Sequence, residues 1–230
     1  MGSETGTTVH QMAAEYIKQR YNKPGNVYVG IVSRLDAMTS GVLVLARTSK
    51  AASRLVPQFS PDAKPGTKAE KTYLAIVEGQ LGSPQGILRD FVRKDDDAKR
   101  MRVVSGELSD ARAAQLRYKV IASDEEGSLI AVRLDTGRKH QIRLQFASRN
   151  HAIIGDRKYS SHQPFDQGIG LHSFRLSVNH PTRGERLSWT VNPPKSWKSR
   201  LREMSVGPEW QRRIDAIDWP SGDDAAEAAR

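Results

Sequence analysis

Short runs of β-branched residues and leucine recur along this chain, and they constrain its fold more than any other feature of the sequence. Polar or charged turns separate the runs, a pattern that predicts strands. The expected strands cover residues 27–32, 42–46, 72–78, 116–122, 129–134, 152–154, 171–178 and 187–191. Many strands with few helices between them are typical of an α+β fold, here a mostly antiparallel mixed sheet flanked by helices.

Helical spacing of apolar residues is confined to three segments. It predicts an amphipathic helix over 9–21, stopped by Pro24-Gly25, a second helix over 50–59, and a third within 137–149. The charged segment 90–112 is predicted to be an exposed hairpin or a mobile loop. We expect one domain over residues 1–205. The polar residues 206–230 form an extension that we expect to be partly disordered, above all after Trp219.

The composition points to a polyanionic partner. Lysine and arginine number 36 against 26 aspartates and glutamates, a formal net charge of +10 that favours nucleic-acid phosphates. The chain has no cysteine, which excludes disulfides and thiol chemistry and fits a reducing compartment. No run approaches the roughly 20 apolar residues that span a bilayer, and no secretion signal opens the chain. We therefore expect a cytoplasmic protein with no membrane partner.

Four segments, in this order, resemble the RluA-type RNA pseudouridine synthases. They are Ser33-Arg34-Leu35-Asp36 with the following 39–46, Lys71-Thr72-Tyr73-Leu74-Ala75, Thr136-Gly137-Arg138-Lys139-His140-Gln141-Ile142-Arg143, and residues 151–156 with Tyr159. The late pair Leu171-His172-Ser173 and His180-Pro181 is also similar to the family pattern. The resemblance implies the pseudouridine synthase catalytic fold over 1–205 and the conversion of uridine to pseudouridine in structured RNA, rRNA or tRNA. It implies Asp36 as the catalytic residue.

A carboxylate suits that chemistry because the ribose passes through an electron-poor C1′ when the glycosidic bond breaks. Asp36 can attack C1′ covalently, or it can take a proton from C2′ to give a glycal. The sequence does not choose between these routes. Neither needs a metal or an organic cofactor, so we expect none.

Arg143 and Tyr73 are the expected partners of Asp36. A nearby guanidinium keeps a carboxylate ionised where water is excluded, and Arg143 is our candidate. Tyr73 is expected to lie against the uracil and to accept the C5 proton as a base. The alternatives are a turn-capping Asp36, a solvated Arg143 and an ordinary core tyrosine.

Basic residues near these motifs are candidate RNA contacts. Arg34, two residues before Asp36 in the sequence, is expected to fill the space that the extruded uridine leaves or to bind the flanking phosphate. Arg138, Lys139 and Arg47 are weaker candidates for phosphate contacts, with a solvated surface role as the alternative. The histidines show no metal-ligand spacing, so no metal site is predicted.

The chain departs from the family pattern in three places. Ser33 stands where histidine is usual, Ala37-Met38 replaces a more polar pair, and the opening strand of the family is not found. No S4-type RNA-binding domain is visible. A missing strand would leave an open sheet edge and predicts lower stability or self-association. Two rival functions remain, a non-catalytic RNA-binding protein that keeps the fold and a basic structural protein of a ribonucleoprotein. The RNA target and the oligomeric state cannot be read from the sequence.

Overall fold

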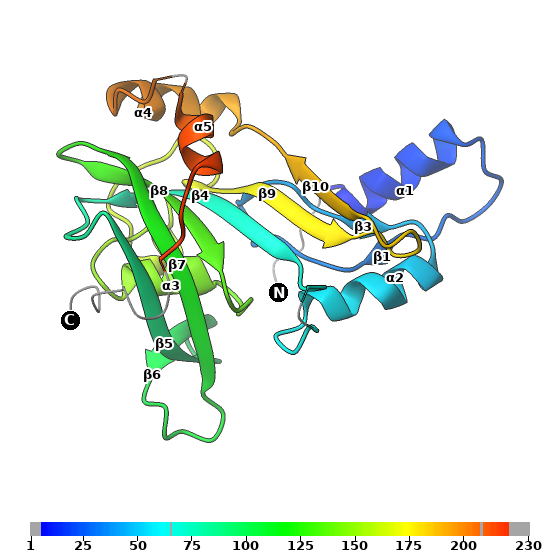
Figure 1. Cartoon of the computed structure of the whole chain (residues 1–230), viewed down its shortest axis with the longest axis horizontal. Helices are drawn as coiled ribbons and strands as arrows, with labels where there is room; N and C mark the ends of the chain where they lie inside the picture. Colours follow the sequence, from blue (N-terminus) through cyan, green and yellow to red (C-terminus); the bar gives the residue numbers. More distant parts are fainter. Residues whose placement is uncertain (1–5, 65, 208, 221–230) are drawn as a thin grey trace. The chain divides into compact units, whose positions relative to one another are not determined.

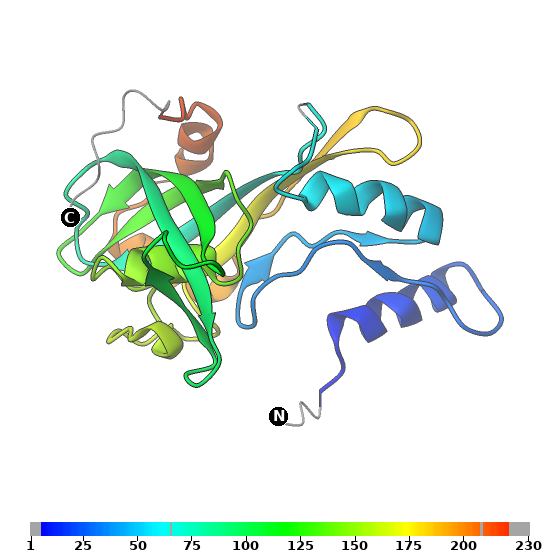
Figure 2. The same cartoon turned by 90° about the horizontal axis from the view of Figure 1, so that it is seen from below.

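The computed structural model describes residues 6–64, 66–207 and 209–220, drawn in Figures 1 and 2. These residues form two compact units. The first contains residues up to 34, residues 43–69 and the turn 178–187, and the second contains 35–42, 70–177 and 188 onward. Within the described residues, no helix is both long enough and apolar enough to cross a bilayer.

The first unit begins with helix α1 (Val9–Arg20), which matches the predicted helix. Thr8 caps it, because its hydroxyl accepts from the Gln11 amide at 3.2 Å and the Gln11 side chain accepts from the Thr8 amide at 2.8 Å. The helix ends in the predicted turn, where Asn22 and Gly25 have positive φ. Strands β1 (Gly30–Ile31) and β3 (Leu45–Ala46) pair antiparallel and are shorter than predicted.

Helix α2 (Ser49–Leu55) and the 3-10 helix η1 (Val56–Phe59) together fill the segment predicted as the second helix. The helix gives way to 3-10 geometry at Pro57, which has no amide hydrogen to donate. Gln58, only 7% exposed, exchanges two hydrogen bonds with the Asn179 backbone, donating to its carbonyl at 2.9 Å and accepting from its amide at 2.8 Å. These bonds hold the 178–187 turn within this unit.

A mixed sheet forms the second unit, and its strand order is β10-β9-β4-β8-β7-β5-β6, with β2 paired to β9. The strands are β2 (Ser40–Gly41), β4 (Glu70–Glu78), β5 (Gln85–Asp95), β6 (Arg100–Val104), β7 (Arg112–Ser123), β8 (Gly127–Leu134), β9 (Leu171–Asn179) and β10 (Arg186–Thr190). Antiparallel pairing joins β4 to β8 and β9, β5 to β6 and β7, and β7 to β8, whereas β2 runs parallel to β9. The predicted α+β fold with a mostly antiparallel mixed sheet is confirmed.

Strand β4 is buried on both faces, so its side chains enter two cores in alternation. Tyr73, Ala75 and Val77 join helix α3 (Gln141–Ala147) on one face. Leu74 and Ile76 pack with helices α4 (Lys198–Glu203) and α5 (Trp210–Asp215) on the other. Figure 1 shows α3 and the pair α4–α5 on different sides of these strands.

Three local predictions need correction. Residues 152–154 are not a strand, because their described pairing is a single bridge between Ile153 and Val77. Segment 90–112 is the predicted hairpin, but its first strand starts earlier, at Gln85. Helices α4 and α5 were not predicted. Helix α5 lies inside the predicted extension 206–230 and buries Ile214 to 4% exposure, while most of the segment predicted to be disordered lies outside the described residues.

Candidate active site

Residues 35–42, called the Asp36 loop below, are tied to strand β9. The Asp36 carbonyl accepts from the Thr39 amide at 3.1 Å, which closes a tight turn. Strand β2 then runs parallel to β9, and the Val42 amide donates to the Ser173 carbonyl at 2.9 Å. Gly41 has φ +118°, and a Cβ there would lie 2.3 Å from the Ser173 carbonyl oxygen. Only glycine therefore allows this approach, which holds the Asp36 loop at a fixed position.

His172 strengthens this attachment from inside the sheet. Its ring is 1% exposed, its Nε2 lies 2.9 Å from the Val191 carbonyl oxygen, and its Nδ1 lies 2.8 Å from the Ser40 hydroxyl. Because a carbonyl oxygen only accepts, Nε2 carries the hydrogen, and Nδ1 of the neutral ring accepts from Ser40. Burial lowers the pKa of His172, against the Val191 carbonyl, which raises it. A neutral imidazole thus fixes β2, four residues beyond Asp36.

Arg143 lies between two carboxylates. It projects from α3 and is 5% exposed, and its Nε and Nη2 donate to Asp156 at 2.6 and 2.8 Å. Its Nη1 lies 3.6 Å from Asp36 Oδ2. Burial lowers the pKa of Arg143, but the hydrogen bond and charge of Asp156, together with the charge of Asp36, outweigh it and leave the pKa raised. The guanidinium is fully charged, and Asp156 already balances it.

One guanidinium thus faces two carboxylates, and Asp36 is the one that Arg143 does not balance; it is called the surplus carboxylate below. Its side chain keeps 26% of its exposure, whereas Asp156 is 1% exposed and engaged through both oxygens. Arg143 attracts Asp36 at 3.6 Å, a separation too long for a hydrogen bond. The Asp36 carboxylate thus keeps lone pairs available for a substrate.

Tyr73 completes the predicted trio. It is 9% exposed in β4, opposite Ser173 of β9 and Val132 of β8. Burial raises the pKa of Tyr73 to about 12, the charge of Asp36 adds to the effect, and a hydrogen bond with the Ser173 side chain opposes it. The phenol therefore holds its proton at neutral pH. The structure brings Asp36, Tyr73 and Arg143 together, and their catalytic roles stay predictions.

Two further side chains surround Arg143. The Tyr159 ring centre lies 5.1 Å from the Arg143 guanidinium carbon, and the Tyr159 hydroxyl accepts from the Met101 amide at 3.1 Å. That hydroxyl also lies 2.8 Å from Nδ1 of His140, a residue with φ +54° just before α3. Burial lowers the pKa of His140, and the positive charge of Arg143 lowers it further against the attraction of Asp36. Tyr159 thus links Arg143 to the β5–β6 hairpin.

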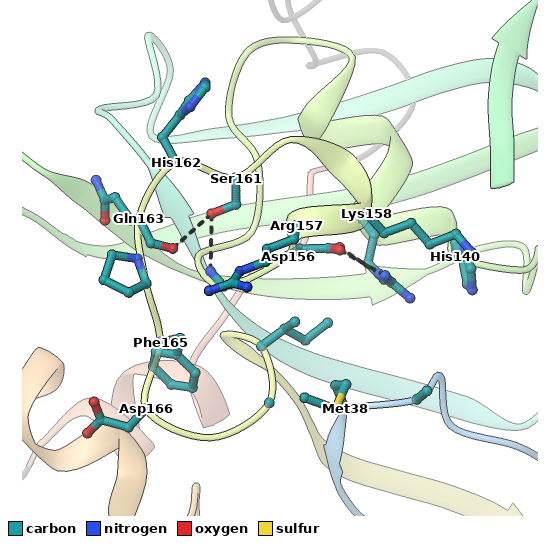
Figure 3. Close-up of a pocket in the computed structure, with 16 residues that line it drawn as sticks. Met38, His140, Asp156, Arg157, Lys158, Ser161, His162, Gln163, Phe165 and Asp166 are labelled. Atoms are coloured by element: carbon teal, nitrogen blue, oxygen red, sulfur yellow. Dashed lines mark hydrogen bonds and ion pairs between the residues drawn. The ribbon is translucent and has the colours of Figure 1, made fainter. Parts of the chain in front are cut away.

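A cavity of about 640 Å³ opens next to this cluster, and its lining residues are drawn in Figure 3. Its walls are Ala37 and Met38 of the Asp36 loop, His140, Arg143, and residues from the segment 155–169, called the cavity loop below. Neither Asp36 nor Tyr73 lines it. The cavity is therefore adjacent to the trio and not centred on it.

The candidate RNA contacts have mixed surroundings. Lys139 is exposed, and Arg138 donates from its Nε to the Ala113 carbonyl at 2.9 Å. Arg34 and Arg47 belong to the first unit, where both are exposed and Arg47 donates to the Tyr21 hydroxyl at 2.9 Å while lying 4.1 Å from its ring centre. An RNA role for these residues stays a prediction.

Asp156, Tyr159 and His140 were not predicted to be site residues, although all three lie in segments that resemble the family motifs. The Gly155-Asp156 dipeptide after an apolar run was the available signal. The described residues contain no group of three or more histidines and carboxylates arranged to hold a metal ion.

Comparisons with known proteins converge on one family. The sequence model of the family RNA pseudouridylate synthase matches residues 2–148. An uncharacterized RNA pseudouridine synthase of Aquifex aeolicus is 33% identical over 210 residues, covering 86% of this chain and 63% of that protein. A tRNA pseudouridine synthase C of Yersinia pestis is 31% identical over 208 residues, covering 80% of this chain and 78% of that protein.

A solved structure has the same fold. The structure of human RNA pseudouridylate synthase domain containing 4 superposes with a TM-score of 0.68 at 21% identity, covering 86% of this chain and 84% of that one. The chain spans less than two thirds of the length of the Aquifex protein.

Proposed function

Because the chain belongs to the RNA pseudouridylate synthase family, we propose that it converts uridine to pseudouridine in structured RNA, rRNA or tRNA. The observation that carries this proposal is the surplus carboxylate of Asp36, held 3.6 Å from the buried Arg143 guanidinium and close enough to Tyr73 to raise its pKa. The tRNA enzyme among its relatives supports tRNA as a substrate class.

Asp36 acts on the ribose. Its free oxygen either bonds to C1′ or takes the C2′ proton to give a glycal, and in both routes the C1′–N1 bond breaks with its electron pair leaving on uracil. C5 of the turned uracil then bonds to C1′, and Asp36 either leaves C1′ as a carboxylate or returns the proton to C2′. Arg143 pairs with Asp36 and, since Asp156 holds the other edge of the guanidinium through two hydrogen bonds, it does so from a fixed position. Deuterium at C2′ separates the routes, because only proton abstraction gives a primary isotope effect.

Tyr73 lies against the turned uracil and serves at the last step, when the C5 proton leaves. Burial first and the Asp36 charge second raise the pKa of Tyr73 to about 12, so the phenol is protonated at neutral pH. To take the C5 proton, the Tyr73 hydroxyl must therefore pass its own proton to solvent in the same step.

Tritium release from C5-labelled uridine tests the proposal. Wild-type protein is incubated with labelled tRNA and rRNA transcripts beside Asp36→Asn and a control, Asp62→Asn, which changes an exposed carboxylate of the first unit. Release by wild type and control that Asp36→Asn lowers roughly 10³-fold or more supports the enzyme. RNA binding without any release by wild type would instead support the non-catalytic RNA-binding protein.

A further inference from the structure

We propose that the cavity beside Arg143 binds the nucleotide next to the target uridine in the RNA, its base on Phe165 and its phosphate at Arg157 and Lys158. This inference rests on the proposed function and deepens it. The cavity is a second subsite, because neither Asp36 nor Tyr73 lines it, whereas the target ribose must reach Asp36.

The walls of the cavity explain why a neighbouring nucleotide would occupy it. Ala37 and Met38, which line it, directly follow Asp36 in the chain. The Met38 carbonyl accepts from the Ile169 amide of the cavity loop at 3.2 Å, so the Asp36 loop is itself one wall. Arg143, whose guanidinium lies 3.6 Å from Asp36, also lines the cavity. An RNA strand whose target uridine contacts Asp36 therefore reaches the cavity with an adjacent nucleotide.

Charge favours a phosphate at the rim. Arg157 and Lys158 are exposed on the 3-10 helix η2 (Arg157–Tyr159), and neither has an ion-pair partner among the described residues. One exposed carboxylate of the lining, Asp166, opposes them, while Asp156 is already balanced by Arg143. The remaining balance is positive, as a phosphate site needs.

A flat apolar surface for a base lies across the cavity. Phe165 is half-buried, and its ring meets Trp197 edge to face, with centroids 5.8 Å apart at 89°. In Figure 3 the side chains of Phe165 and Met38 lie below the row formed by Asp156, Arg157 and Lys158. An aromatic ring held in this way stacks on any base, because every base has a π-face.

The cavity loop is built before any ligand arrives. One oxygen of Glu78 accepts three hydrogen bonds from it, from the Ser161 hydroxyl at 2.7 Å, the His162 amide at 2.6 Å and the Gln163 amide at 2.8 Å. Gly168 has φ +81°, and a Cβ there would lie 2.5 Å from the Met38 carbonyl oxygen. The volume of about 640 Å³ falls in the range of about 300–1,000 Å³ typical of small-ligand sites.

The experiment uses a stem-loop RNA in which tritium release has located the target uridine. Three versions are compared: the intact RNA, and RNAs in which the nucleotide 5′ or 3′ of the target lacks its base but keeps ribose and phosphate. Wild type is measured beside Phe165→Leu and its control Phe91→Leu, an exposed phenylalanine of β5. Arg157→Gln/Lys158→Gln is matched by Lys198→Gln/Arg202→Gln, which removes the same charge from exposed positions of α4.

The expected result is that base removal on one side of the target lowers wild-type kcat/KM about tenfold but changes Phe165→Leu less than about twofold. Arg157→Gln/Lys158→Gln should lower kcat/KM about tenfold on every RNA and flatten its salt dependence more than the α4 control does. Tritium release that is indifferent to both flanking bases, or equal losses for Phe165→Leu on intact and abasic RNA, would overturn the inference alone. No release from any RNA by wild type would overturn the proposed function and this inference with it.

Discussion

Arg143 and Arg200, two buried arginines of the second unit, differ in where their second carboxylate lies. Each holds one aspartate through two nitrogens, Asp156 for Arg143 and Asp124 for Arg200. The second carboxylate of Arg200 is Glu203 on the same helix, 3.5 Å away and 59% exposed. That of Arg143 is Asp36, 26% exposed.

The two second carboxylates, Glu203 beside Arg200 and Asp36 beside Arg143, differ in how far solvent reaches them. Glu203 is exposed to solvent, so its attraction to Arg200 contributes little. Asp36 begins a turn that is fixed to β9 and lies beside Arg143 and Tyr73, so its charge acts at short range on these neighbours. The hydrogen bonds that Arg200 donates to Asp124 are the largest influence on the pKa of Arg200 and raise it, whereas the largest influence on the pKa of Arg143 is burial, which lowers it and which two carboxylates must overcome.

Replacing each arginine by lysine should give the largest difference in activity between the two pairs. Lysine keeps the charge but cannot donate to both oxygens of the partner from a fixed fork. We expect Arg143→Lys to lower kcat about 10³-fold, because Asp36 loses its fixed partner, and to lower the free energy of unfolding by about 2 kcal/mol. Arg200→Lys should cost a similar amount of stability and leave kcat within about twofold. Urea unfolding and tritium release measure both. Equal kcat losses in the two variants would show that the pairs do not differ in function.

Tyr73→Phe should have the next largest effect and tests the role of the Tyr73 hydroxyl beside Asp36. The ring remains in the core, so the free energy of unfolding should change by less than about 1 kcal/mol. Loss of the hydroxyl should lower kcat about 10²-fold with KM nearly unchanged, because proton transfer is affected and binding is not. Tyr118→Phe, a buried tyrosine of β7, is the matched control. Wild-type kcat in Tyr73→Phe would reduce Tyr73 to a packing residue.

The comparison also shows what the sequence could reveal. Asp36, Tyr73 and Arg143 were found through motif resemblance, since their separations along the chain carry no periodic signal. Asp156 was quoted in a motif but given no role, because its part follows from a bidentate contact that only the folded chain displays. The strands were predictable because β-branched runs are local signals.

Helices α4 and α5 could not be predicted from such local signals. They are short and rich in charged residues, so their propensity is weak. They fold because Met204 and Ile214 are buried against the face of the sheet that carries Leu74, which is a tertiary effect. Arg200 itself is buried at 8% exposure on such a helix, a position where sequence alone favours a solvated residue.

The smallest expected effect concerns His172, which holds the Asp36 loop through Ser40. Unlike the two arginines, His172 would support the site as a neutral group. Burial lowers the pKa of His172 below its ordinary value of 6.5, so the unfolded chain binds a proton more readily than the folded one. Its contribution to stability is therefore complete above about pH 6.5 and is lost as the pH falls from there through the folded pKa.

His172→Gln keeps a donor for the Val191 carbonyl but does not titrate. Urea unfolding at pH 7.5, 6.5 and 5.5 should show a smaller loss of stability on acidification for this variant than for wild type, whereas His162→Gln, at an exposed position, should follow wild type. His140, whose pKa burial also lowers, leaves a residual slope in every variant. If His172→Gln loses stability as steeply as wild type, the neutral ring between Ser40 and Val191 is not what acid disrupts, and the Asp36 loop must be held mainly by the pairing of β2 with β9.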